Sequence, residues 1–322
     1  MLMSMISIQS FKEKKYLPYI IMTIPMVIGG TTWPLGKWLV SSYYGSTIPQ
    51  LIIIVARYFI AIPIFFLILI INENNIHFQF AKRHIRYLAI LGLMNLTIYQ
   101  IGYMYGETYT TGTDASLLIA TIPIAVFTIT LLFLQYKFTT EHLIGIMTGF
   151  FGVSLVILFE TSSSSEVTNP SLGNLLIIMA VIAFAIYTVL LKEFMNILCK
   201  TETKISSLAI LAWISVFGTV FILPITFLLN PTYLSFQAFI EIPTRIWIGI
   251  IYLGIFPTVI GFMLYIEGIK LLDPNKAVVF TNIIPIVRIT LSAIFLDEKI
   301  NVLVHLGSLI LIFISIYLVN KK

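Results

Sequence analysis

The sequence predicts an all-α polytopic membrane protein whose ten transmembrane helices form two inverted five-helix repeats. Hydrophobic residues make up 59% of the 322 residues and charged residues only 10%, whereas soluble domains carry about 25% charged residues. The mean hydropathy is +1.01. In addition, residues 86–160 resemble residues 248–322 without a gap. An internal repeat of this kind is typical of membrane proteins built from two related halves.

Ten apolar stretches are long enough to cross a bilayer, which takes about 20 mostly apolar residues in a helix. They cover residues 17–41, 48–71, 85–106, 113–134, 142–160, 172–192, 205–229, 246–267, 276–296 and 302–320. The first stretch follows three lysines, as in a signal sequence, but it is too long and has no small-residue cleavage site. We therefore expect it to be the first membrane helix. The links are too short to form a soluble domain.

The positions of Lys and Arg predict which links face the cytoplasm. If the N-terminus is inside, the outer loops carry only Arg245 and Lys299, and the other basic residues between spans fall on the inner side. We therefore expect a multi-pass protein of the cell membrane with both termini in the cytoplasm. Each half, residues 17–160 and residues 172–320, has five spans. Because five is odd, the second half enters the membrane from the opposite side, so the repeat is inverted.

The repeat is carried by small, aromatic and proline residues. Equivalent pairs about 162 positions apart include Gly92 and Gly254, Tyr103 and Tyr265, Ala115 and Ala277, and the Ile-Pro-Ile runs 122–124 and 284–286. The second copy continues with Asp297-Glu298-Lys299, whereas the first has Tyr136 at the position of Glu298. In their order and spacing, these features resemble the ten-helix EamA type of the drug/metabolite transporter superfamily.

The resemblance implies transport of small metabolites, with amino acids and their analogues as the commonest substrates. It also implies a central cavity lined mainly by the first, third, fourth, sixth, eighth and ninth helices. We therefore expect an exporter that works by alternating access between its two halves. A carrier of organic or phosphorylated anions is the alternative, and a membrane enzyme or a non-transporting scaffold is a remote one.

Charged side chains inside the spans are candidates for substrate binding, because each costs about 2.5–3.5 kcal/mol at the centre of a membrane helix. Arg288 follows Pro285 by about one turn, and its repeat mate is Val126. Its planar guanidinium suits a substrate carboxylate; the alternative is a structural Arg bonded to helix carbonyls. For Arg57 in the second span we favour a structural role.

The third span combines polar and aromatic residues on one helix face. Asn95, Tyr99 and Tyr103 are four residues apart, so they share a face, and together with Gln100 they suit the wall of a binding cavity. Hydrogen bonding between helices is the alternative.

Further candidate binding residues, which packing explains nearly as well, are Trp33, Tyr187, Tyr265 and Asn282. Pro123 and Pro285 are paired by the repeat, which favours a shared structural or hinge role.

Several classes of protein are disfavoured. No Asp or Glu lies in the middle of a span, which argues against a proton-coupled drug exporter of the same superfamily. No His and acid residues have the spacing of a metal site or a catalytic triad, so we expect no metal, no cofactor and no enzymatic activity. The basic residues lie between apolar spans, so nucleic acid is not an expected partner; the bilayer and a small substrate are.

The GxxxG spacings at Gly102–Gly106 and Gly145–Gly149 favour close packing inside a monomer, with a homodimer face as the alternative.

Overall fold

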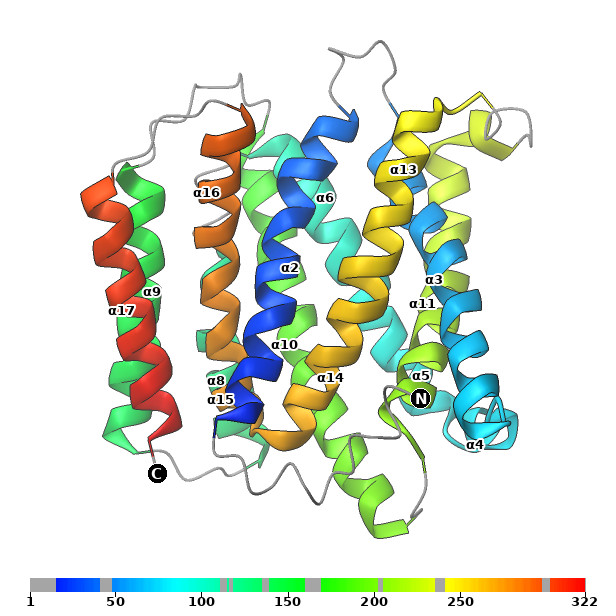
Figure 1. Cartoon of the computed structure of the whole chain (residues 1–322), viewed down its shortest axis with the longest axis horizontal. Helices are drawn as coiled ribbons and strands as arrows, with labels where there is room; N and C mark the ends of the chain where they lie inside the picture. Colours follow the sequence, from blue (N-terminus) through cyan, green and yellow to red (C-terminus); the bar gives the residue numbers. More distant parts are fainter. Residues whose placement is uncertain are drawn as a thin grey trace.

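The computed structural model describes residues 16–40, 48–110, 115, 118–134, 139–159, 169–201, 205–234, 241–296 and 302–321. Within these ranges every regular element is a helix (Figure 1). The first half contains α2 (Leu17–Val40), α3 (Gln50–Glu73), α4 (Phe78–Arg83), α5 (Ile85–Gly92), η2 (Leu93–Ile98), α6 (Tyr99–Tyr109), α8 (Ile122–Leu134) and α9 (Thr140–Phe159). The second half contains α10 (Pro170–Thr201), α11 (Ser207–Leu229), η3 (Pro231–Leu234), α13 (Thr244–Leu253), η4 (Gly254–Gly261), α14 (Phe262–Leu271), α15 (Pro274–Val278), η5 (Val279–Asn282), α16 (Ile283–Leu296) and α17 (Val302–Asn320).

These elements form ten membrane segments, because some of them continue one another along a single helix axis. The third segment is α5, η2 and α6; the eighth is α13, η4 and α14; the ninth is α15, η5 and α16. In the described part of the chain, six helices are by length and composition alone able to cross a membrane, and two shorter helices are also apolar. The predicted all-helical membrane fold is confirmed.

The packing of the helices repeats itself when the two halves are exchanged. Helix α2 of the first half packs against α14 and α16 of the second half, and α10, its counterpart, packs against α6 and α8 of the first half. The pairs α3–α11 and α9–α17 join equivalent helices. Each half is thus completed by the other, as expected for a pseudo-two-fold axis between inverted repeats.

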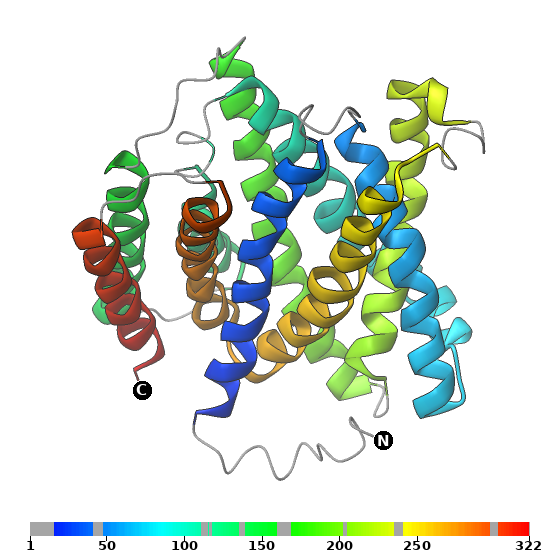
Figure 2. The same cartoon turned by 45° about the horizontal axis from the view of Figure 1, so that its top comes forward.

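The helices lie side by side, with the α9–α17 pair at one edge of the molecule and α3 with α11 at the other (Figures 1 and 2). Helix α2 begins and α17 ends at the same end of the bundle (Figure 1), as an even number of crossings requires. Which side of the membrane this end faces stays a prediction.

Both GxxxG segments lie at helix contacts inside the monomer. A Cβ atom on Gly149 of α9 would come within 2.5 Å of Ser315 Oγ on α17. On α6, a Cβ atom on Gly102 would come within 2.7 Å of the Leu176 carbonyl oxygen on α10. Gly102 therefore fits a close approach of two backbones, whereas at Gly149 the absence of a Cβ leaves room for the side chains of Ser315 and Asn282.

The third and eighth membrane helices each contain a π-helical segment, and the two segments are equivalent by the repeat. They are η2 and η4. Within η4, Pro257 has no N–H to donate to the Leu253 carbonyl, and the Thr258 hydroxyl donates to that oxygen instead at 2.8 Å. Within η2, the Thr97 hydroxyl donates to the Gly218 carbonyl of α11 at 3.2 Å.

The fourth and ninth membrane helices are also irregular at equivalent places. In the fourth, a turn at residues 120–121 precedes α8. In the ninth, the 3₁₀ segment η5 precedes α16. Pro123 and Pro285 follow these irregular segments. Because proline has no N–H, the carbonyls of Ile119 and Thr281 lack the donor that a regular α-helix would supply.

Candidate functional site

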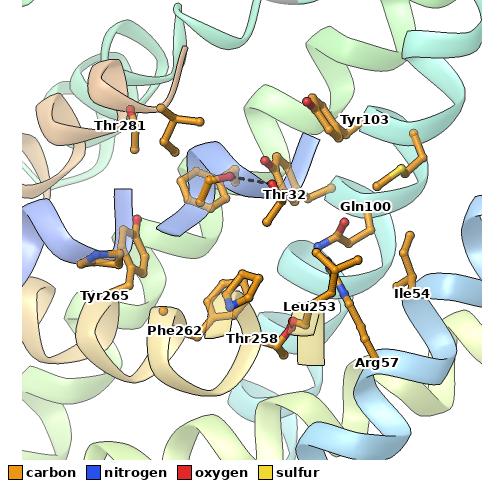
Figure 3. Close-up of a pocket in the computed structure, with 18 of the residues that line it drawn as sticks. Thr32, Ile54, Arg57, Gln100, Tyr103, Leu253, Thr258, Phe262, Tyr265 and Thr281 are labelled. Carbon is orange, nitrogen blue, oxygen red and sulfur yellow. Dashed lines mark hydrogen bonds between the residues drawn. The ribbon is translucent and has the colours of Figure 1, made fainter. Parts of the chain in front are cut away.

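A cavity of about 280 Å³ is lined by residues of both halves. Figure 3 shows many of the side chains in its wall. Its wall is built from α2, α3, α6, the fourth membrane helix, α10, and the eighth and ninth membrane helices. Six of these seven segments are the ones that the family resemblance implies. The structure adds the second membrane helix, α3, which contributes Gln50, Ile53, Ile54 and Arg57.

Much of the wall consists of residue pairs that the repeat makes equivalent. The pairs are Tyr99 and Gly261, Gln100 and Phe262, Tyr103 and Tyr265, Ile119 and Thr281, and Ile122 and Ile284. The pseudo-two-fold axis therefore passes through the cavity. All four irregular helix segments border the cavity or adjoin a residue that lines it.

Aromatic rings form one continuous side of the cavity. The ring of Tyr99 stacks on Tyr103 with centroids 5.9 Å apart and lies 5.0 Å from the ring of Phe184. Phe184 in turn lies 5.9 Å from Tyr265, whose hydroxyl is 3.0 Å from the Thr188 hydroxyl. These contacts hold the rings in place, and their faces suit an apolar or aromatic substrate group.

Another part of the cavity wall carries a charged and an amide side chain, Arg57 and Gln100. Arg57 is only 7% exposed, and its buried Nε atom has no hydrogen-bond partner among the residues that the structure describes. Its guanidinium carbon lies 5.3 Å from the centroid of the Tyr58 ring. Figure 3 shows the polar ends of Arg57 and Gln100 directed toward one another in the right half of the view, whereas Tyr265 and Thr281 lie at the left. Among the described residues that line the cavity, Arg57 is the only charged one.

The structure brings together four of the binding residues that the sequence predicts. Tyr99, Gln100, Tyr103 and Tyr265 all line the cavity, and Arg57, for which we expected a structural role, lines it as well.

Four other predicted binding residues do not line the cavity. Asn95 is buried in η2, and the buried Asn282 packs against Gly149 of α9. Tyr187 is fully buried behind Phe184, at a centroid distance of 6.0 Å. Arg288 is half-buried on α16. Binding by these four residues stays a prediction.

The remaining predicted residues belong to α2 and to the two proline positions. Trp33 belongs to α2, and its side chain falls outside the described residues. Pro123 and Pro285 are buried next to the irregular segments described above. Sequence reasoning missed Phe184, Thr258 and Phe262. Phe262 is the repeat mate of Gln100, so projecting the third span onto the eighth would have found it.

A cavity on the pseudo-two-fold axis between inverted membrane repeats is typical of membrane transporters. The model of the EamA-like transporter family matches residues 17–158 and 171–321. The chain therefore belongs to the EamA-like transporter family, whose members are transporters and not enzymes.

Comparisons with individual proteins agree with this assignment. The chain is 27% identical over 296 residues to the uncharacterized transporter YetK of Bacillus subtilis, covering 92% of this chain and 84% of YetK. It is 25% identical over 275 residues to the uncharacterized transporter YyaM of the same organism, covering 85% of this chain and 84% of YyaM. A protein of known crystal structure matches with a TM-score of 0.72 over 95% of this chain and 97% of its own, at 12% identity. That match shows the fold alone.

Proposed function

We propose that the protein exports a small metabolite, with an amino acid as the first candidate, by alternating access. The observation that carries this proposal is the meeting of irregular helix segments from both halves at one cavity. In transporters with inverted repeats, discontinuous helices near the middle of the membrane form the substrate site, because irregular backbone is tolerated there only where it is buried in protein or lines a cavity.

The size and lining of the cavity support a small substrate. At about 280 Å³ it lies just below the usual range for small-molecule sites, which is about 300–1,000 Å³. A molecule as large as an amino acid fits such a space, whereas a large drug or a lipid does not. The aromatic rings of Tyr99, Phe184 and Tyr265 offer faces to an apolar side chain.

The packing around the cavity supports a state that is closed at the end where α2 begins. There Met22 is fully buried against Gly268 of α14, and the ring of Tyr19 stacks on Phe280 with centroids 6.2 Å apart. Toward the other end, the lining extends to Gln50 in the first turn of α3. With cytoplasmic termini, this arrangement corresponds to an outward-facing transporter, and rocking of the two halves gives the inward-facing one.

The test is counterflow in proteoliposomes that contain the purified protein. Vesicles are preloaded with one unlabelled amino acid, and entry of the same labelled amino acid is followed, with each of the twenty amino acids tested in turn. We expect saturable exchange of at least one of them, above the level in protein-free vesicles. If none of the twenty exchanges, the proposed amino-acid specificity is wrong.

A further inference from the structure

We propose that Arg57 and Gln100 bind the carboxylate of the substrate, and that the substrates are small monocarboxylates whose apolar part lies against the aromatic wall. The aromatic wall is the set of rings Tyr99, Phe184 and Tyr265. This inference rests on the proposed function, because it assumes that the cavity is where the transported molecule binds.

The first argument is the electrostatic state of Arg57. A guanidinium stays protonated in proteins, and burying it without a partner is unfavourable. Arg57 is more than nine-tenths buried, and its Nε atom has no hydrogen-bond partner in the described parts of the chain. Within the described part of the chain, no carboxylate forms an ion pair with Arg57. The Tyr58 ring contacts the guanidinium but carries no negative charge, so an anion entering the cavity supplies the counter-charge that the described residues do not.

The second argument concerns the number of charges. Arg57 is the only charged side chain among the described lining residues. A carboxylate with one negative charge neutralises it. A phosphate dianion leaves one negative charge without a partner in a region of low dielectric constant, which is unfavourable. The cavity therefore favours monocarboxylates over phosphorylated compounds.

The third argument is the asymmetry of the cavity. Gln100 of the first half and Phe262 of the second occupy equivalent positions on its wall. The amide of Gln100 lies on the side of Arg57, and Phe262 and Tyr265 lie away from it (Figure 3). The guanidinium presents planar donors that match a carboxylate, and the amide adds further donors. A molecule with one polar and one apolar end thus has one preferred orientation.

The test compares three probes that share one carbon skeleton. Leucine carries both an amine and a carboxylate, 4-methylvalerate carries the carboxylate alone, and leucinamide carries the amine alone. Equilibrium binding of each radiolabelled probe to the purified protein is measured in nanodiscs. With the wild-type protein, we expect saturable binding of leucine and 4-methylvalerate, and at least tenfold weaker binding of leucinamide.

Binding measurements on variants then test whether Arg57 and Gln100 bind the carboxylate. Hydrogen bonds to charged groups are strong, so Arg57→Gln and Gln100→Leu are expected to weaken 4-methylvalerate binding, by about 10- to 100-fold for Arg57→Gln. Arg57→Lys keeps the charge and is expected to recover part of the loss. Ser154→Ala is the control, because Ser154 does not line the cavity and its hydroxyl donates to the Phe150 carbonyl of its own helix, at 2.8 Å. Elution from a gel-filtration column checks that each variant is folded.

Four results overturn the inference. They are equal binding of leucinamide and leucine to the wild-type protein, unchanged 4-methylvalerate binding by Arg57→Gln, tighter binding of 3-methylbutyl phosphate than of 4-methylvalerate, and no saturable binding of either carboxylate. If Arg288→Gln weakens 4-methylvalerate binding and Arg57→Gln does not, the carboxylate binds at Arg288, and the inference is likewise overturned. If the carboxylates bind as expected but show no counterflow, the proposed transport function fails while the carboxylate site stands.

Discussion

Lys192 joins two helices of the second half at the end of the bundle where the cavity is closed. Its ammonium group, on α10, donates to three carbonyl oxygens at the C-terminus of α14. They are those of Ile269 at 2.8 Å, Lys270 at 3.1 Å and Leu272 at 2.9 Å. The last carbonyls of a helix have no partner within the helix, and a cation there also interacts favourably with the helix dipole. Lys192 therefore serves as a cap supplied by a neighbouring helix.

We predict that Lys192→Met lowers the free energy of unfolding by about 2–4 kcal/mol. A hydrogen bond to a charged group contributes about 1.5–3 kcal/mol, and the interaction with the helix dipole contributes about 0.3–1 kcal/mol. The three bonds share one ammonium group, so their contributions are not additive. Methionine keeps most of the length of the lysine side chain, so the loss of the cap dominates the effect.

The assay is thermal unfolding of the purified protein in detergent, followed by circular dichroism. Lys200→Met is the matched control, because Lys200 lies on the same helix and is exposed. Lys192→Arg retains donors for the carbonyls and is expected to unfold between wild type and Lys192→Met. If Lys192→Met and Lys200→Met unfold at the same temperature as the wild type, the capping role is refuted.

Three further predictions test the orientation, the helix packing and the buried polar groups. Cys199 is the single cysteine and is exposed. If the termini are cytoplasmic, a membrane-impermeant maleimide should label Cys199 only after cells are permeabilised. Labelling in intact cells would show that the predicted orientation is wrong. Gly149→Ala places a Cβ within 2.5 Å of Ser315 Oγ and should destabilise the protein by about 1–3 kcal/mol in thermal unfolding, whereas Gly307→Ala, which meets open space, should not. Both amide atoms of Asn282 are buried without partners, so Asn282→Leu should raise the free energy of unfolding by about 1–3 kcal/mol; a lower unfolding temperature would contradict this reasoning.

The membrane fold was predictable because its determinants act over short stretches of sequence. The length of each apolar run defines a span, and five spans in each half make the repeat inverted. Pro123 and Pro285 mark two of the irregular segments, since a missing N–H is visible in the sequence. The π-helical segment η2 contains no proline. Its position depends on contact with α11, which the sequence does not reveal.

The candidate site was predictable only where polarity distinguishes one helix face from another. The third span has a polar face, and its Tyr99, Gln100 and Tyr103 line the cavity. Helix α3 is apolar all around apart from Arg57 and a few residues at its ends, so its sequence does not indicate which face meets the cavity. Tertiary packing sets that rotation, and it places Arg57 in the wall of the cavity. For the same reason Phe184, one apolar residue among many on α10, carried no signal.

A binding site on a two-fold axis has a consequence for the molecule inside it. If the two copies were identical, the wall would look the same after half a turn, and an unsymmetrical ligand would have two poses of equal energy. The difference between Gln100 and Phe262 removes this degeneracy. Divergence between the two copies thus made the two ends of the cavity chemically different, while the scaffold kept the symmetry that the proposed alternating access requires.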